Sequence, residues 1–263
     1  MTEMVKVKNS AFAEAYCKRA KAFRGTGNYE QAILNYKKAA DLDSDYLAAF
    51  VGLGDLFRTT GNCEGAILNY TRAIELDPCA AKLYAYRASA YGSLGDYELE
   101  IADYTQVIRL KPNDVSAYGK RGILCMKNGN YRQTVHDLSR VLELKPEFDW
   151  AHVILGDARS VLGEYEEAVK EYSSFILRKP EFAETYHSRG KAYAGLGDND
   201  QAIKDFTKAV TLGPDLADAY VSRGEAYKRT GDRGLAVKDF RTAVKLGSVR
   251  ARDLLASEDI FGE

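Results

Sequence analysis

Residues 183–216 read AETYHSRGKAYAGLGDNDQAIKDFTKAVTLGPDL, and this stretch of 34 residues has six counterparts elsewhere in the chain. A glycine that returns every 34 residues, with no insertion or deletion, aligns them at Gly27, Gly61, Gly95, Gly129, Gly163, Gly197 and Gly231. A fixed period of this kind indicates a repeat array. Because each repeat can bury its apolar face only against its neighbours, we expect an open stack whose surface carries the function.

Each repeat has the pattern of two helices joined by a short turn. Tyr186 and Tyr193 lie at helical spacing in the first half of the quoted repeat, and Ile203 and Phe206 do so in the second half. The glycine between the halves adopts the left-handed conformation that ends a helix, and the Asn or Asp that usually follows it caps the next helix. Prolines close five of the repeats, at Pro78, Pro112, Pro146, Pro180 and Pro214.

The alignment resembles the tetratricopeptide repeat family, whose pattern has a small residue at repeat position eight and alanine at position twenty. Counted from Ala13, position eight is small in every repeat: Ala20, Gly54, Ala88, Gly122, Gly156, Gly190 and Gly224. Position twenty is alanine except for Glu100 and Thr134 in the third and fourth repeats, where we expect looser helix packing. The resemblance covers Ala13 to Arg250. It implies an all-α fold, a right-handed α-solenoid of antiparallel helix pairs with a C-terminal capping helix.

Three segments are expected along the chain. Residues 1–12 form an N-terminal lead-in, residues 13–250 form seven tandem repeats, and residues 251–263 form a capping helix and tail. Ser248 is placed to cap a final helix from about Val249 to Ser257 that would cover the exposed face of the last repeat. Ile260 and Phe261 either fold back onto this cap or form a contact point for a partner or a second copy.

The composition excludes several classes of function. With 37 Lys and Arg against 38 Asp and Glu, the net charge of -1 gives no overall attraction to nucleic acid. The chain has no apolar run of membrane-helix length and no secretory signal, so we expect a cytoplasmic protein. The four cysteines form no CxxC pair, and the three histidines belong to no metal or nucleophile motif. We therefore expect free thiols, no metal, no cofactor and no enzymatic activity.

Tyrosine and arginine follow the repeat closely. Of the 18 tyrosines, 16 lie at packing positions, so we expect them in the core rather than on a stacking platform for single-stranded nucleic acid. Only Tyr46 and Tyr86 fall outside these positions. Arg at position seven accompanies Asp at position twenty-three in four repeats, which predicts four ion pairs, each contributing about 0.2 to 1 kcal/mol if exposed.

The resemblance also implies a binding surface, because in this family the first helices line a groove with positions two, five, six, nine, twelve and thirteen. In the first four repeats these positions form a basic wall with Lys18, Lys21, Arg24, Arg58, Lys82 and Lys120. The middle of the same surface is apolar, with Tyr86, Ile123, Met126, Trp150, Val153 and Ile154. Aromatic and Met side chains of this kind are typical of interface anchors. The alternatives are that the charges are only solvated and that the apolar residues pack between helices or against a second copy.

A peptide segment or protein bound in this groove is the function we expect, with an acidic stretch at the basic wall and an apolar anchor near Trp150. One branch of the family grips the C-terminal tails of heat-shock chaperones. Of the residues that this grip needs, only Lys82 matches, so that partner is disfavoured. RNA binding through the basic repeats, and a role as the interaction domain of a larger enzyme or signalling protein, are the other hypotheses.

Overall fold

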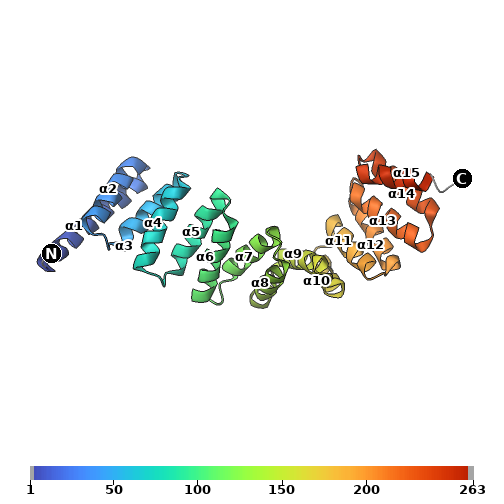
Figure 1. Cartoon of the computed structure of the whole chain (residues 1–263), viewed down its shortest axis with the longest axis horizontal. Helices are drawn as coiled ribbons and strands as arrows, with labels where there is room; N and C mark the ends of the chain where they lie inside the picture. The colour runs from blue at the N-terminus through green and yellow to red at the C-terminus, as the bar shows by residue number, and fades with distance from the viewer. Residues whose placement is uncertain (1–2, 260–263) are drawn as a thin grey trace. The chain divides into compact units, whose positions relative to one another are not determined.

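The computed structural model describes residues 3–259, which form fifteen α-helices and no β-strand (Figure 1). The helices are α1 (Glu3–Gly25), α2 (Tyr29–Leu42), α3 (Leu47–Thr59), α4 (Cys63–Leu76), α5 (Ala81–Leu94), α6 (Tyr97–Leu110), α7 (Val115–Lys127), α8 (Tyr131–Leu144), α9 (Asp149–Val161), α10 (Tyr165–Arg178), α11 (Ala183–Gly195), α12 (Asn199–Leu212), α13 (Ala217–Thr230), α14 (Arg233–Lys245) and α15 (Val249–Asp259). This is the expected all-α helical-repeat solenoid.

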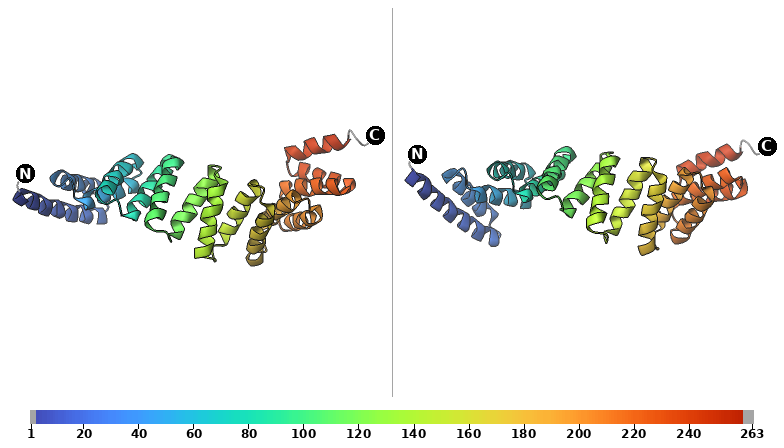
Figure 2. Two further views of the ribbon diagram at one scale, coloured as in Figure 1. Left: turned by 60° about the horizontal axis from the view of Figure 1, so that its bottom comes forward. Right: turned by 90° about the horizontal axis from the view of Figure 1, so that it is seen from below.

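The chain divides into two compact units, residues 1–124 and residues 125–263, with the division inside α7. Within each unit the two helices of a repeat pack side by side, as α1 and α2 do in the first unit and α11 and α12 in the second (Figures 1 and 2). The second helix of a repeat then packs on the first helix of the next, as α4 does on α5 and α12 on α13. None of the described helices is long and apolar enough to cross a membrane.

The turn between the helices of a repeat has the predicted chemistry. All seven periodic glycines have positive φ, between 76° and 93°. The side chain after the glycine caps the second helix at Asn28, Asn62, Asp96, Asn130 and Asp198. The prediction is wrong at Asp232, whose carboxylate makes no cap and instead lies 3.4 Å from the hydroxyl of Thr230.

Close approach of the paired helices depends on position eight, as predicted. A Cβ at Gly224 would lie 2.6 Å from the ring of Phe240, and a Cβ at Gly190 would lie 2.6 Å from the ring of Phe206. Both rings are buried. The prediction that tyrosines pack in the core is wrong at Tyr29 and Tyr97, which are exposed at the first residues of α2 and α6.

Three of the four predicted Arg–Asp pairs are confirmed, and in each the aspartate is buried and the arginine half-buried. Arg87 Nη2 and Nε donate to the two carboxylate oxygens of Asp103 at 2.7 and 2.9 Å, and Arg87 Nη1 donates to Thr71 Oγ1 of the preceding repeat at 2.9 Å. The same contacts recur at Arg189 and Arg223. Each of these arginines therefore links the two helices of its own repeat to the repeat before it.

The C-terminal helix α15 covers the last repeat. Ser248 Oγ accepts a hydrogen bond from Ala251 N at 3.2 Å, which is the predicted cap. Ala251 is fully buried against Val221 and Ala243, and Leu254 packs on the same cluster. At the other end, residues 3–12 belong to α1. Ile260 and Phe261 lie outside the described residues, so their role stays a prediction.

Candidate binding site

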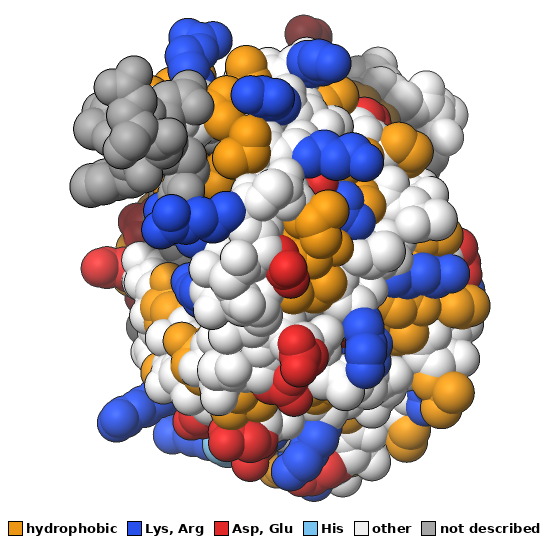
Figure 3. Space-filling view, turned by 90° about the vertical axis from the view of Figure 1, so that its right-hand side faces the viewer, with side chains coloured by type: hydrophobic (Ala, Val, Ile, Leu, Met, Phe, Trp, Pro, Cys, Tyr) orange, Lys and Arg blue, Asp and Glu red, His pale blue; other side chains and the backbone are white. Residues whose placement is uncertain are grey.

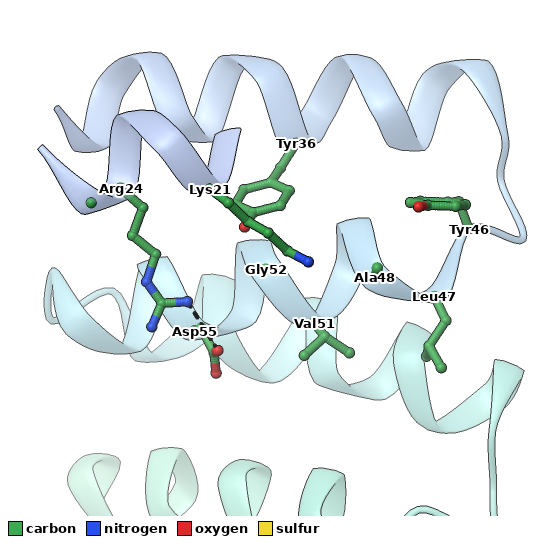
Figure 4. A pocket seen from close by; sticks show the side chains of 10 residues that line it. Lys21, Arg24, Tyr36, Tyr46, Leu47, Ala48, Val51, Gly52 and Asp55 are labelled. Carbon is green, nitrogen blue, oxygen red and sulfur yellow. Dashed lines mark hydrogen bonds and ion pairs between the residues drawn. The ribbon is translucent and has the colours of Figure 1, made fainter. Parts of the chain in front are cut away.

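A pocket of about 890 Å³, the first hollow, opens between the first helices of the first two repeats (Figure 4). Helix α1 contributes Lys21, Arg24 and Gly25, and α2 contributes Tyr36. The N-cap residue of α3 and the first three turns of that helix supply the rest of the lining: Tyr46, Leu47, Ala48, Val51, Gly52 and Asp55. Figure 4 shows Tyr46 and Leu47 at one end and the charged groups of Arg24 and Asp55 at the other. The Lys21 side chain lies between them, and its ammonium points toward the apolar side, near Ala48 and Val51. The first hollow can therefore hold an apolar group beside a polar or charged one.

The charged end of the first hollow leads into a connected network in the first unit. Arg24 Nη1 lies 3.3 Å from Asp55 Oδ2, and Tyr70 Oη donates to Asp55 Oδ1 at 2.8 Å. Arg58 Nε donates to Tyr70 Oη at 3.4 Å, and the Arg58 guanidinium lies 5.6 Å from the ring centre of Tyr86. Asp55 is therefore neutralised within the molecule, whereas Lys21 forms no ion pair with any described residue.

A pocket of about 420 Å³, the second hollow, lies in the second unit. Its lining comes from α7, α9, α10 and α11: Met126, Asp157, Ser160, Val161, Tyr165, Tyr172, Ser188, Lys191 and Ala192. Tyr172 Oη donates to Asp157 Oδ1 at 2.7 Å, and Ser160 Oγ lies 3.3 Å from the same hydroxyl. Burial raises the pKa of the Asp157 carboxyl, against the lowering effects of the Tyr172 hydrogen bond and of Lys191.

The two hollows occupy equivalent places in the repeat. In each, the back wall is a position-24 tyrosine, Tyr36 or Tyr172, and the next repeat has a small residue at position six, Gly52 or Ser188. A smaller pocket of about 220 Å³ has Ser222 at this position. Where position six is larger, the space is filled: the Tyr86 ring lies 5.7 Å from that of Tyr70, and Lys120 Nζ lies 5.3 Å from the ring centre of Tyr104.

Only part of the predicted basic wall lines a pocket. Lys21 and Arg24 lie in the first hollow, whereas Lys18 is exposed and paired with Glu14 at 2.7 Å. The other cations of the wall lie on the first helices of their repeats: Arg58 against Tyr70 and Tyr86, Lys82 exposed at the start of α5, and Lys120 over Tyr104. The sequence therefore predicts a continuous basic wall, whereas in the structure Lys18 and Arg24 of this wall are paired with carboxylates.

The predicted apolar residues are also divided. Tyr86 is half-buried against Tyr70, Ile123 is half-buried in the first unit, and Met126 lines the second hollow. Trp150 is 38% exposed, with its ring centre 6.1 Å from that of Phe148. Val153 and Ile154 are half-buried on α9, and none of these last three residues lines either hollow.

Sequence reasoning missed the residues that open the hollows. Tyr36 and Tyr172 were expected in the core, and they are buried, but their hydroxyl ends reach a pocket. Gly52 and Ser188 are not among the predicted binding residues, because they are neither charged nor large and apolar. Side-chain size at position six is the signal that could have found both hollows.

The face of the molecule shown in Figure 3 does not carry charge of a single sign. Lys and Arg side chains are interspersed with Asp and Glu and with apolar groups over the face shown in Figure 3. No group of three or more His, Cys, Asp or Glu side chains that could hold a metal ion occurs among the described residues. The four cysteines are free thiols, and burial raises the pKa of Cys17 to about 11.

Comparisons with known proteins agree with this architecture. A family model described as TPR repeat matches residues 20–61, 54–95 and 195–231, and one described as tetratricopeptide repeat matches residues 81–114 and 217–246. Together these matches span more than half of the chain. A search among curated protein sequences finds no match.

Solved structures share the fold. A crystal structure of MamA protein is 27% identical, covers 65% of this chain and 94% of its own, and has a TM-score of 0.61. A tetratricopeptide repeat protein from Parabacteroides merdae is 24% identical, with 94% of this chain and 98% of its own covered and a TM-score of 0.56. YrrB, titled a TPR protein with an unusual peptide-binding site, is 21% identical over 70% of this chain and 95% of its own, with a TM-score of 0.62. The last two likenesses show the fold alone.

Fold and surface define an all-α helical-repeat protein of the class that acts as protein-interaction scaffolds. Such arrays typically carry no enzymatic activity of their own. Within this class, the chain belongs to the tetratricopeptide repeat family, with seven tandem repeats.

Proposed function

We propose that this protein is an interaction scaffold whose first hollow binds an extended segment of a partner, with an apolar side chain next to an acidic one. The observation that carries this proposal is the composition of the hollow. Tyr46, Leu47 and Val51 line one side, and the Lys21 ammonium points into the hollow beside them. A pocket with mostly apolar walls and a few polar groups is the usual form of a binding site.

Lys21 gives the proposed site its charge preference. Arg24 is already paired with Asp55, whereas the Lys21 ammonium has no ion-pair partner among the described residues. A carboxylate of the bound segment would supply that partner. Lys82, also unpaired and exposed in the same unit, adds positive charge. These two cations without ion-pair partners among the described residues support the proposal of an acidic stretch in the partner.

Trp150 on α9 is proposed as an apolar anchor in the second unit, with Val153 and Ile154 beside it in sequence. Substituting Trp150 and Ile154 together by alanine should abolish binding of a partner that uses this anchor, with little change in helicity. Equal binding by wild type and the double variant would remove Trp150 from the proposed site.

The first hollow is tested by selecting peptides from a random library on the wild-type protein and measuring their affinity for single variants. Lys21→Glu and Val51→Glu should each weaken binding at least about tenfold, because one reverses the charge and the other fills the apolar end with a carboxylate. Lys38→Glu on α2, an exposed cation outside the hollow, is the matched control. Selected peptides without an acidic residue, or equal affinities for all three variants, would contradict the proposal.

RNA binding has no structural observation in its favour. The position-24 tyrosines of the described repeats are buried, so their faces are not free to stack on bases. Binding of single-stranded RNA that falls steeply with added salt would revive that hypothesis. The chain could also serve as the interaction domain of a larger enzyme or signalling protein, and the peptide proposal applies equally to that case.

A further inference from the structure

The second hollow contains a carboxylate, Asp157, that forms no ion pair, although Lys191 lines the same hollow. Asp157 accepts one hydrogen bond, from Tyr172 Oη at 2.7 Å, and forms no ion pair with any Lys, Arg or His of the described residues. It is half-buried, and burial raises its pKa even though Tyr172 and Lys191 act in the opposite direction. A partly desolvated carboxylate of this kind gains from a positive partner.

The first unit contains the same arrangement with the cation in place. Asp55 lies three repeats before Asp157, and Tyr70 three repeats before Tyr172. Tyr70 Oη donates to Asp55 Oδ1 at 2.8 Å, which matches the Tyr172 contact. In addition, Arg24 Nη1 lies 3.3 Å from Asp55 Oδ2. The repeat geometry therefore leaves room for a cation beside this aspartate, and at Asp55 the guanidinium of Arg24 fills it.

Three repeats after Arg24, the offset that relates Asp55 to Asp157, the corresponding residue is Met126. Both stand at position twelve of the repeat before the aspartate, and Met126 lines the hollow. Arg58 is likewise replaced, by Ser160. Both cations near Asp55 are thus absent from the equivalent places near Asp157, and a pocket of about 420 Å³ is present there.

We propose that the second hollow binds the guanidinium or ammonium group of an arginine or lysine in a partner's segment, beside Asp157 where Arg24 stands beside Asp55. The hydroxyls of Ser160 and Ser188 line the same hollow and supply further acceptors. Met126 and Val161 contact the aliphatic part of such a side chain. We expect arginine to bind more tightly than lysine, because a guanidinium can donate to both carboxylate oxygens of Asp157. One of these oxygens also accepts the hydrogen bond from Tyr172.

Lys191 is the competing cation. It lines the hollow, but its side chain is exposed and it forms no ion pair with Asp157. It repels an incoming positive group, so Lys191→Gln should strengthen binding. This site is independent of the first hollow, and loss of either one leaves the argument for the other intact.

The test titrates the full chain with the peptide acetyl-Gly-Gly-Arg-Gly-Gly-amide and follows backbone amide signals by NMR. We expect shifts at Asp157, Tyr172 and Ser188, and at least about tenfold weaker binding to Asp157→Asn. Asp215→Asn, an exposed carboxylate in the loop after α12, is the matched control and should bind like wild type. Equal binding to Asp157→Asn, or equal shifts with the peptide that has Gln in place of Arg, would overturn the proposal.

A reciprocal exchange tests the internal comparison directly. Met126→Arg should place a guanidinium beside Asp157 from within, abolish peptide binding and leave the melting temperature unchanged or higher. Arg24→Met should create a cation site at Asp55, so that the arginine peptide shifts the Asp55 amide, which it does not shift in wild type. Binding that survives Met126→Arg, or no new shift at Asp55, would contradict the equivalence of the two sites.

Free methylguanidinium tests whether the site binds an arginine side chain within a peptide segment or any small guanidinium compound. If the site reads a side chain within a segment, the peptide should bind at least about tenfold more tightly than free methylguanidinium, since the neighbouring backbone adds contacts. Tighter binding of the free cation would overturn the assignment to a partner protein.

Discussion

Glycine at position eight controls how closely the two helices of a repeat approach. In the seventh repeat, Gly224 faces the fully buried ring of Phe240, and an added methyl group would lie 2.6 Å from the ring. Gly234, in the second helix of the same repeat, has open space around it. The two glycines lie in the same repeat but have different surroundings. Comparing their alanine variants therefore distinguishes the effect of packing from that of helix propensity.

Gly224→Ala should lower the free energy of unfolding by about 1 to 3 kcal/mol, because the ring must shift within a packed core. Gly234→Ala should instead raise it by about 0.5 to 1 kcal/mol through helix propensity. Urea unfolding of both variants measures the difference. A stabilising Gly224→Ala would show that the helix pair is not held at this distance by the ring.

His187 provides a pH dependence in the second unit. Its Nε2 lies 2.9 Å from Ser222 Oγ, and its ring packs 5.7 Å from that of Phe206. Burial lowers the pKa of His187 below its ordinary value of 6.5, Lys191 lowers it further, and Asp218 opposes them. The unfolded chain therefore binds a proton more readily than the folded one, and stability is lost as the pH falls from above 6.5 toward the folded pKa.

We expect wild type to lose more stability than His187→Gln between about pH 7.5 and pH 5.5, since the glutamine cannot take up the proton. Urea unfolding at the two pH values measures both proteins, and their difference removes the contribution of other titrating groups. The same loss in both proteins would show that His187 does not drive the dependence.

Paired helices are held to one another and to the preceding repeat by half-buried arginines. Arg189 donates to both oxygens of Asp205 at 2.7 Å, and its Nη1 donates to Ser173 Oγ at 2.9 Å. The second repeat manages without such a pair, with Leu53 in the arginine position and Asn69 in the aspartate position. The same two positions can therefore be occupied by uncharged residues in a repeat of this chain.

Removing one partner of the buried pair by Asp205→Ala should cost about 3 to 5 kcal/mol, because the guanidinium is left without its counter-ion. The double variant Arg189→Leu with Asp205→Asn copies the second repeat and should recover most of that loss. Thermal unfolding of the single and double variants compares them. A double variant less stable than Asp205→Ala would mean that the attraction between Arg189 and Asp205 exceeds the desolvation cost of burying them.

The helix pattern, the turn glycines and the final cap were all predictable, because they depend on local spacing and backbone conformation. The effect of Glu100 and Thr134 on helix packing was not predictable, because it depends on which side chains surround them. Thr134 is fully buried, with its hydroxyl donating to Asn130 O at 3.2 Å, and Gly92 leaves the space that the Glu100 carboxylate occupies. Looser packing in these repeats stays a prediction.

Charge and apolarity at the groove positions do not predict the hollows, for a similar reason. Whether Tyr36 is core or pocket wall depends on the size of Gly52 in the next repeat, and whether Arg24 is free depends on the position of Asp55. Charge and apolarity along the groove positions predict where binding residues gather. They do not predict which of them are already paired within the molecule.

At the scale of the whole chain, recognition is expected to start from charge in the first unit. Lys21 and Lys82 carry no ion pair there, whereas Lys18 and Arg24 do. Reversing both free cations, by Lys21→Glu and Lys82→Glu, should slow association with an acidic peptide and flatten its salt dependence, because steering acts mainly on the association rate. Stopped-flow measurements at several salt concentrations test this. A wild-type rate that does not change with salt would make these charges ordinary solvated surface.

The account rests most on the first hollow, and the most direct measurement is an NMR map of a selected acidic peptide on the full chain. We predict that shifts cluster on Lys21, Val51, Gly52 and Asp55, and that they vanish in Val51→Glu. Shifts confined to the outer faces of α2 and α4, or shifts that persist unchanged in Val51→Glu, would contradict the claim that this hollow binds the partner.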